Sequence, residues 1–127
     1  MSIGWRSMGK TTLVLGASAN EERYSNRAVK KLIAHGHPVI AVGRREGMIG
    51  DQPILKGMPS DAVVDTVTMY LNAHNQEAWE KIVLDLAPRR IIFNPGAENR
   101  EFASQAETRG IEVLEACTLV MLGTGQY

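Results

Sequence analysis

The residues best suited to bind a charged ligand lie in one short stretch that directly follows the apolar run ending at Leu15. A glycine permits a sharp turn, and small residues after it let a ligand approach the backbone. Backbone amides that open the next helix attract anions, so the stretch predicts a cradle for a phosphate or diphosphate. The amides from Gly16 to Ser18, together with Arg23, are predicted to hold the diphosphate. Its turn residues and side-chain donors are Gly16, Ala17, Ser18, Asn20, Arg23 and Ser25.

This turn departs from the usual dinucleotide pattern. Only Gly16 is retained of the three glycines in G-x-G-x-x-G, so the match to an NAD-binding fingerprint is poor. The alternative interpretation is a plain strand-to-helix turn with a capping serine and no ligand.

The residues after the second predicted strand discriminate between nucleotides. NAD-binding domains place an acidic residue there for the ribose hydroxyls, whereas a ribose phosphate favours arginine. This chain has Gly43, Arg44 and Arg45 at that point. The arginines suit coenzyme A (CoA), with its 3′-phosphate, and equally NADP, with its 2′-phosphate. They argue against NAD, unless both side chains are simply solvated.

Two further segments are predicted at the same edge of the sheet. Gly96 and Ala97 lie in a loop that either contacts the far end of a ligand or forms only a turn before an N-cap at Asn99. Cys117 follows the last strand and can meet a thiol or thioester, although a buried structural cysteine is favoured. We identify no base beside Cys117 and no histidine spacing typical of metal ligands, so no catalytic or metal-binding residue is predicted.

Apolar runs alternate with segments of helical periodicity, which is typical of βαβ units and a parallel sheet. Crossovers of the usual right hand give a single doubly wound, Rossmann-like α/β sheet of order 3-2-1-4-5, with a sixth strand at the edge and helices on both faces. The stretch 43–59 is predicted as a loop with one short strand at Ile54 and Leu55. The other predicted strands are 12–15, 39–42, 63–70, 91–93 and 111–114, and the predicted helices are 25–35, 76–86 and 99–109.

The helical stripes predict which side chains face the core. The first stripe comprises Ala28, Val29, Leu32 and Ile33, the second Trp79, Ile82, Val83 and Leu86, and the third Phe102, Ala103 and Ala106. Asn75 is the expected N-cap of the second helix.

Length and charge limit the classes of partner. The chain has 127 residues, one cysteine and a formal net charge of zero. A neutral chain gives no electrostatic reason to bind nucleic acid or an anionic membrane, and the lone cysteine favours the cytoplasm. We expect one domain over residues 10–127 and an extension over 1–9. The G-x-x-x-x-G-K-T pattern from Gly4 to Thr11 is not read as a P-loop, because a strand follows it where a P-loop needs a helix.

Taken together, the motif order resembles the small stand-alone CoA-binding proteins, which are related to the CoA-binding domain of the succinyl-CoA synthetase alpha subunit. The resemblance covers residues 11 to 121 and rests mainly on the Gly-Ala-Ser turn with its following Asn, Arg and Ser. Tyr70, Gly96 and Cys117 match later family positions. Where the family usually has Asn-Pro after the second strand, this chain has Gly43 and Arg44.

The resemblance implies a protein that binds CoA or an acyl-CoA and, without the synthetase's second domain, no ligase activity. It also implies Tyr70 as a wall of the ligand site. The alternatives are an NADP-dependent oxidoreductase, and a regulatory or partner-binding protein with a vestigial nucleotide site. A small-molecule ligand is the expected partner, and a homo-oligomer stays open.

Overall fold

The computed structural model describes residues 9–127. The predicted extension over residues 1–9, apart from Gly9, and most of the glycine-rich pattern that begins at Gly4 therefore lie outside the described residues. The strands are β1 (Thr12–Leu15), β2 (Val39–Val42), β3 (Gly47–Ile49), β4 (Gln52–Leu55), β5 (Thr66–Met69), β6 (Arg90–Phe93) and β7 (Glu112–Glu115). The α-helices are α1 (Tyr24–Ala34), α2 (Ala73–Gln76), α3 (Glu80–Leu86), α4 (Arg100–Thr108) and α5 (Thr118–Gly123), and a 3₁₀ turn, η2 (Glu77–Trp79), joins α2 to α3.

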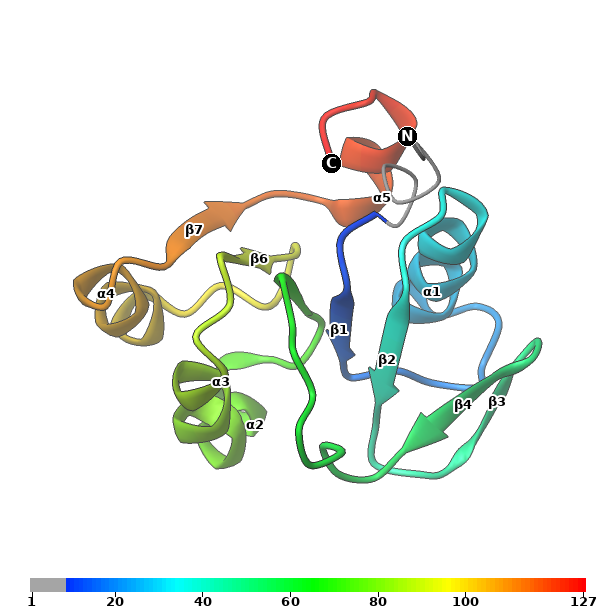
Figure 1. The fold of residues 1–127 in the computed structure, drawn as a ribbon, viewed down its shortest axis with the longest axis horizontal. Helices are drawn as coiled ribbons and strands as arrows, with labels where there is room; N and C mark the ends of the chain where they lie inside the picture. Colours follow the sequence, from blue (N-terminus) through cyan, green and yellow to red (C-terminus); the bar gives the residue numbers. More distant parts are fainter. Residues whose placement is uncertain (1–8) are drawn as a thin grey trace, which may run out of the picture.

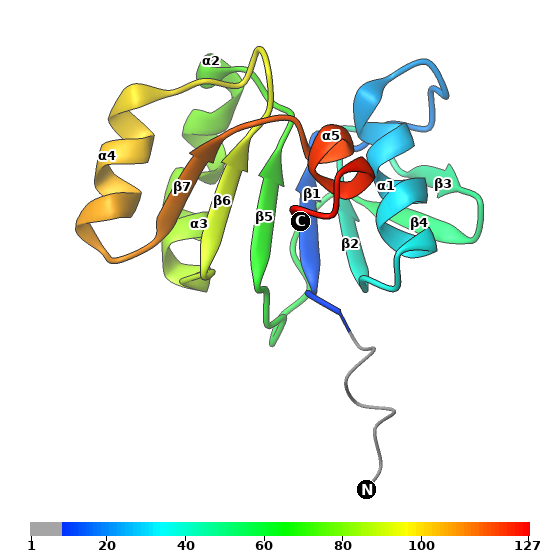
Figure 2. The ribbon, with the colours of Figure 1, turned by 90° about the horizontal axis from the view of Figure 1, so that it is seen from above.

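These strands form one sheet of order β3-β4-β2-β1-β5-β6-β7. Figure 2 shows them side by side, with β1 near the centre. All neighbours pair in parallel except β3, which pairs antiparallel with β4 at one edge. The predicted Rossmann-like class is therefore confirmed, and the six parallel strands follow the predicted order. The antiparallel edge strand β3 is additional and was not predicted.

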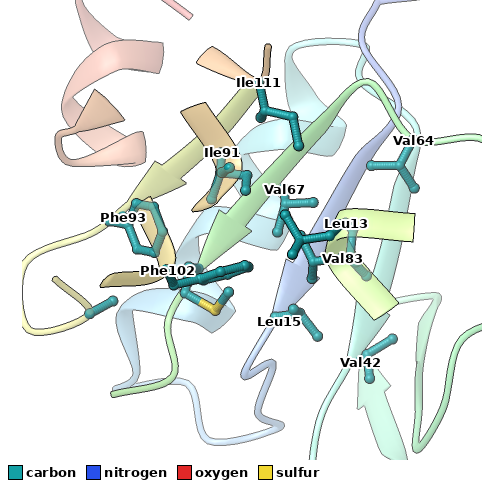
Figure 3. Close-up of a cluster of buried hydrophobic side chains, with 14 residues drawn as sticks. Leu13, Leu15, Val42, Val64, Val67, Val83, Ile91, Phe93, Phe102 and Ile111 are labelled. Atoms are coloured by element: carbon teal, nitrogen blue, oxygen red, sulfur yellow. The ribbon is translucent and has the colours of Figure 1, made fainter. Parts of the chain in front are cut away.

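Helices cover both faces of the sheet (Figure 1). Side chains of α3 and α4 pack with Leu13 and Leu15 on one face, whereas α1 and α5 pack with Val14 on the other. Alternation along β1 explains this division, because successive side chains of a strand point to opposite faces. Figure 3 shows the larger cluster, in which Phe93 and Phe102 meet edge to face with ring centroids 5.9 Å apart.

The first predicted helical stripe is mostly correct. Ala28, Val29 and Leu32 of α1 are fully buried, but Ile33 is 46% exposed. Position 33 lies about 100° around the helix from Leu32, on the flank of the stripe. The apolar face of α1 is therefore narrower than its sequence suggests.

The second predicted helix begins earlier than expected. Its N-cap is Asn72, whose side chain accepts a hydrogen bond from the Asn75 amide at 2.9 Å, so the prediction of Asn75 as the cap is wrong. Ile82 is 40% exposed, whereas Leu84, which was not predicted, is buried beside Val83. The 3₁₀ turn η2 shifts the register of the stripe, because it has three residues per turn rather than 3.6.

Two strand predictions also need correction. The strand predicted over 63–70 is shorter, because Val63 is 83% exposed and β5 begins at Thr66. The stretch predicted as a loop with one strand is a hairpin, in which β3 and β4 enclose the two-residue turn Gly50–Asp51. Gly50 has φ +59°, which fits a turn with glycine at its first central position.

A short helix that the sequence pattern did not predict, α5, closes the face that carries α1 (Figure 2). The following segment brings the Tyr127 ring over Arg90, with the guanidinium carbon 4.3 Å from the ring centroid. Arg90 is buried and its Nε donates to the Thr66 hydroxyl at 2.8 Å. No helix within residues 9–127 has the length and apolar character needed to cross a membrane.

Candidate functional site

The carboxyl ends of the parallel strands bring the predicted site segments to one edge of the sheet. Hydrogen bonds between neighbouring strand ends align them, for example from the Gly43 amide to the Leu55 carbonyl at 2.9 Å and from the Tyr70 amide to the Leu15 carbonyl at 2.9 Å. In doubly wound sheets this edge is where ligands bind. The residues that follow the parallel strands here are Gly16, Gly43, Lys56, Tyr70, Asn94 and Ala116.

The turn after β1 depends on its glycine and is held by β2. Gly16 has φ +98°, a conformation that other residues rarely adopt. The amides of Gly16 and Ala17 both donate to the Val42 carbonyl, at 2.9 and 3.0 Å. These two amides are thus engaged inside the protein, so the prediction that they donate to a diphosphate is wrong. Amides without an acceptor lie further along the turn.

Close approach between two loops makes Gly43 necessary. A Cβ on Gly43 would lie 2.2 Å from the Ala17 carbonyl oxygen, far inside normal contact distance. Glycine here lets the loop after β2 pack against the turn after β1. The two segments predicted to bind phosphate groups, Gly16–Ser25 and Gly43–Arg45, are therefore neighbours in space.

Five backbone amides between β1 and the first turn of α1 have no protein acceptor among residues 9–127. Arg23 is the N-cap of α1, and its side chain makes no capping hydrogen bond. Unbonded amides at a helix start carry the positive end of the helix dipole, which favours an anion. The unbonded amides are those of Ser18, Ala19, Glu21, Tyr24 and Ser25.

The side chain of Asn20, predicted as a ligand donor, instead shapes the turn together with that of Ser18. The Ser18 hydroxyl accepts a hydrogen bond from the Asn20 amide at 3.1 Å, and the Asn20 side-chain oxygen accepts one from the Glu22 amide at 2.9 Å. The Ser25 side chain is buried, while that of Arg23 is exposed at the edge. Arg23 thus presents a charge that forms no ion pair within the described residues, and Ser18 and Asn20 hold the backbone.

A pocket of about 120 Å³ opens beside this turn, on the face that carries α3. Its floor is apolar and its rim carries two cations, Arg44 and Lys56. No ion pair within residues 9–127 involves either cation, nor Arg23 or Arg45. The remaining lining residues are Leu15, Gly16, Val42, Gly43, Leu71 and Trp79.

Tyr70 and Cys117 lie at the same edge but away from this pocket. Tyr70 packs with Val14 and Ala17 on the face that carries α1, whereas its neighbour Leu71 lines the pocket. Burial raises the pKa of Tyr70, and the nearby Cys117 adds to the shift. The free thiol of Cys117 is partly buried at the start of α5.

A buried asparagine joins the segments around Cys117. The Asn94 side chain donates to the Thr68 hydroxyl at 2.8 Å and to the Met69 carbonyl at 2.9 Å, and it accepts from the Thr118 amide at 2.8 Å. It thereby fixes the start of α5 over the ends of β5 and β6. Gly96, with φ +93°, is exposed in the next loop, and Ala97 is buried there.

Sequence reasoning missed three residues of the pocket. Trp79 was expected in the core and is only partly buried at its margin, Leu71 was not among the predicted site residues, and Lys56 lay in a segment predicted mainly as loop. The strand prediction at Ile54 and Leu55 was the available signal for Lys56, because the residue after a parallel strand lies at the carboxyl edge.

Other solved structures share this fold. A solved structure titled as an uncharacterized protein shares 43% sequence identity, with a TM-score of 0.90 over 94% of this chain and 98% of that chain. A hypothetical protein from Pyrococcus horikoshii OT3 (18% identity, TM-score 0.82, covering 91% of this chain and 83% of its own) shares the fold. A protein from Thermus thermophilus also shares the fold, with 23% sequence identity and a TM-score of 0.81 over 95% of this chain and 92% of that chain.

A search of curated proteins gives no significant match. The sequence profile described as CoA binding domain matches residues 10–123, which is nearly all of the described chain. This match confirms the resemblance drawn from the Gly16 turn. The chain therefore belongs to the CoA binding domain family.

Proposed function

We propose that this protein binds CoA or an acyl-CoA at the carboxyl edge of the sheet, between the turn after β1 and the loops after β2 and β4. One observation carries the proposal: Arg44 and Lys56, which form no ion pair within residues 9–127, line a pocket beside Gly16 and Gly43, and the turn that begins at Gly16 carries backbone amides without an acceptor in those residues. Family membership supports CoA as the nucleotide.

The diphosphate of the ligand fits the start of α1. The amides from Ser18 to Ser25 that have no acceptor within residues 9–127 are the donors, and Arg23 adds charge. Charge-assisted hydrogen bonds to phosphate are stronger than neutral ones and suit this arrangement. Gly16 and Ala17 shape the turn but donate no hydrogen bond to the ligand, because their amides are bonded to the Val42 carbonyl.

The ribose phosphate and the base fit the pocket. Arg44 and Lys56 supply positive charge at the rim, with Arg45 exposed next to them, and Trp79 offers a flat aromatic surface to a base. At about 120 Å³ the pocket is smaller than the ~300–1,000 Å³ of typical ligand sites, so it holds one part of the ligand. The pantetheine arm then runs along the edge toward Gly96 and Cys117.

Thermal denaturation with CoA, dephospho-CoA, NADP and NAD added in turn tests the proposal. A ligand at a hundred times its dissociation constant stabilises the fold by about 2.7 kcal/mol. We expect a clear rise in Tm with CoA, a smaller one with dephospho-CoA at the same concentration, and none with NAD. A rise with NADP and not with CoA would instead favour the oxidoreductase, and no rise with any nucleotide would favour a regulatory protein with a vestigial site.

The double variant Arg44→Ala/Lys56→Ala tests the placement of the ribose phosphate. A hydrogen bond to a charged group contributes about 1.5–3 kcal/mol, so CoA affinity should fall at least tenfold. The preference for CoA over dephospho-CoA should disappear in this variant, as measured by titration calorimetry. Arg109→Ala, which removes one exposed charge after α4, is the matched control and should bind CoA as the wild type does. An unchanged preference in the double variant would refute this placement.

A further inference from the structure

The buried side chain of Asn26 lies beneath the turn after β1. Asn26 is 1% exposed, in the first turn of α1, where an apolar residue would continue the buried stripe of Val29. Its Nδ2 donates to the Ser18 carbonyl at 2.9 Å. Its Oδ1 is buried and has no partner among residues 9–127. Burying an amide with one unbonded end costs free energy, so the residue is poorly explained by packing alone.

The bond from Asn26 fixes the orientation of one peptide group in the turn. In a trans peptide the C=O of one residue and the N–H of the next point in opposite directions. Because Nδ2 of Asn26 binds the Ser18 carbonyl, the Ala19 N–H of the same peptide points away from the Asn26 side chain. Ala19 is exposed, and its amide is one of those without an acceptor within the described chain.

Other hydrogen bonds fix the turn on either side of the peptide between Ser18 and Ala19. The Ala17 amide is held by Val42, and the Asn20 amide donates to the Ser18 hydroxyl. The peptide between Ser18 and Ala19 lies between these two anchors, and its carbonyl is bonded by Asn26. Without that bond, the peptide can rotate and present its carbonyl to the ligand side, which would repel an anion.

We propose that Asn26 is a positioning residue for the phosphate cradle: it holds the peptide between Ser18 and Ala19 with its N–H toward the diphosphate of the ligand. The inference rests on the proposed CoA binding at this turn. Asn26 does not touch the ligand and acts through the Ser18 carbonyl. Loss of the Asn26 side chain should therefore lower the affinity for CoA by more than a loss of folding stability explains.

The variants Asn26→Leu and Asn26→Asp test this role by titration calorimetry with CoA. The first removes the donor and keeps a similar volume, and the second places an acceptor against the Ser18 carbonyl. We expect each to weaken CoA binding at least tenfold at pH 8, equivalent to about 1.4 kcal/mol. Thr66→Val, which deletes a buried hydroxyl bonded to Arg90 at the opposite edge, is the control for loss of stability and should keep wild-type affinity.

Protonation gives a readout that a merely structural role would not produce. Burial raises the pKa of the carboxyl introduced by Asn26→Asp, and its protonated form regains a donor for the Ser18 carbonyl. The affinity gap between this variant and the wild type should therefore narrow as the pH falls from 8 to 5.5. The gap for Asn26→Leu should stay constant over the same range.

Amide NMR spectra test the role of Asn26 even where a variant is less stable than the wild type. In the wild type, CoA should shift the Ala19 amide resonance, and in Asn26→Leu this shift should be lost while the folded spectrum persists. Variants that bind CoA within twofold of the wild type, with the Ala19 shift intact, would overturn the role of Asn26. Failure of the wild type itself to bind CoA would instead refute the proposed function.

Discussion

Gly43→Ala should lower the free energy of unfolding by about 3 kcal/mol, the upper range for overpacking a close contact. The added Cβ would lie 2.2 Å from the Ala17 carbonyl oxygen, and this neighbour is backbone that cannot rotate aside. Relief requires the turn after β1 to move away from Val42, which breaks the two hydrogen bonds from Gly16 and Ala17. We therefore expect CoA binding to be lost together with stability, as measured by urea denaturation and calorimetry.

Gly57→Ala is the matched control for this substitution. Gly57 is exposed, and a Cβ there would meet nothing within 4 Å. Its stability should stay within about 0.5 kcal/mol of the wild type, or rise slightly through loss of chain entropy in the unfolded state. Equal effects of the two substitutions would contradict the close approach of the loops after β1 and β2.

Asn94→Ala should destabilise the fold by about 3 kcal/mol and release the start of α5. The substitution deletes three buried hydrogen bonds and leaves the Thr118 amide without its acceptor. Each buried group left unbonded costs about 1–3 kcal/mol. Because Cys117 precedes α5, we also expect its reaction with a thiol reagent to become faster, which can be followed by absorbance.

Asn75→Ala serves as the asparagine control, since Asn75 is exposed within α2. Neither its stability nor the reactivity of Cys117 should change measurably. If Asn94→Ala left the thiol reactivity at the wild-type rate and the stability within 0.5 kcal/mol, Asn94 would not be the residue that anchors α5.

The sequence was sufficient for the parts of the site that depend on strand order. An apolar run that ends at Leu15, followed by Gly16 and a helix, places the turn at the carboxyl edge, and the structure has it there. The same logic placed Gly43 and Arg44 beside it, and both line the pocket. These predictions succeeded because parallel strands bring their ends together regardless of the intervening chain.

Contacts between segments could not be predicted in the same way. The engagement of the Gly16 and Ala17 amides by Val42 depends on how closely two loops approach, which no local pattern encodes. Trp79 lines the pocket from η2, a 3₁₀ turn that the helical periodicity did not predict. The β3–β4 hairpin did have a local signal, the Gly50–Asp51 pair between short apolar runs, and the four glycines of the segment obscured it.

An amide NMR titration of the wild-type protein with CoA directly tests ligand binding at the carboxyl edge of the sheet. We expect shifts that saturate and concentrate at the carboxyl edge, at Ser18, Ala19, Ser25 and Lys56 and at the Trp79 indole, with Thr66 at the opposite edge unaffected. The absence of any shift at millimolar CoA, or shifts gathered around Thr66 and Arg90, would contradict it.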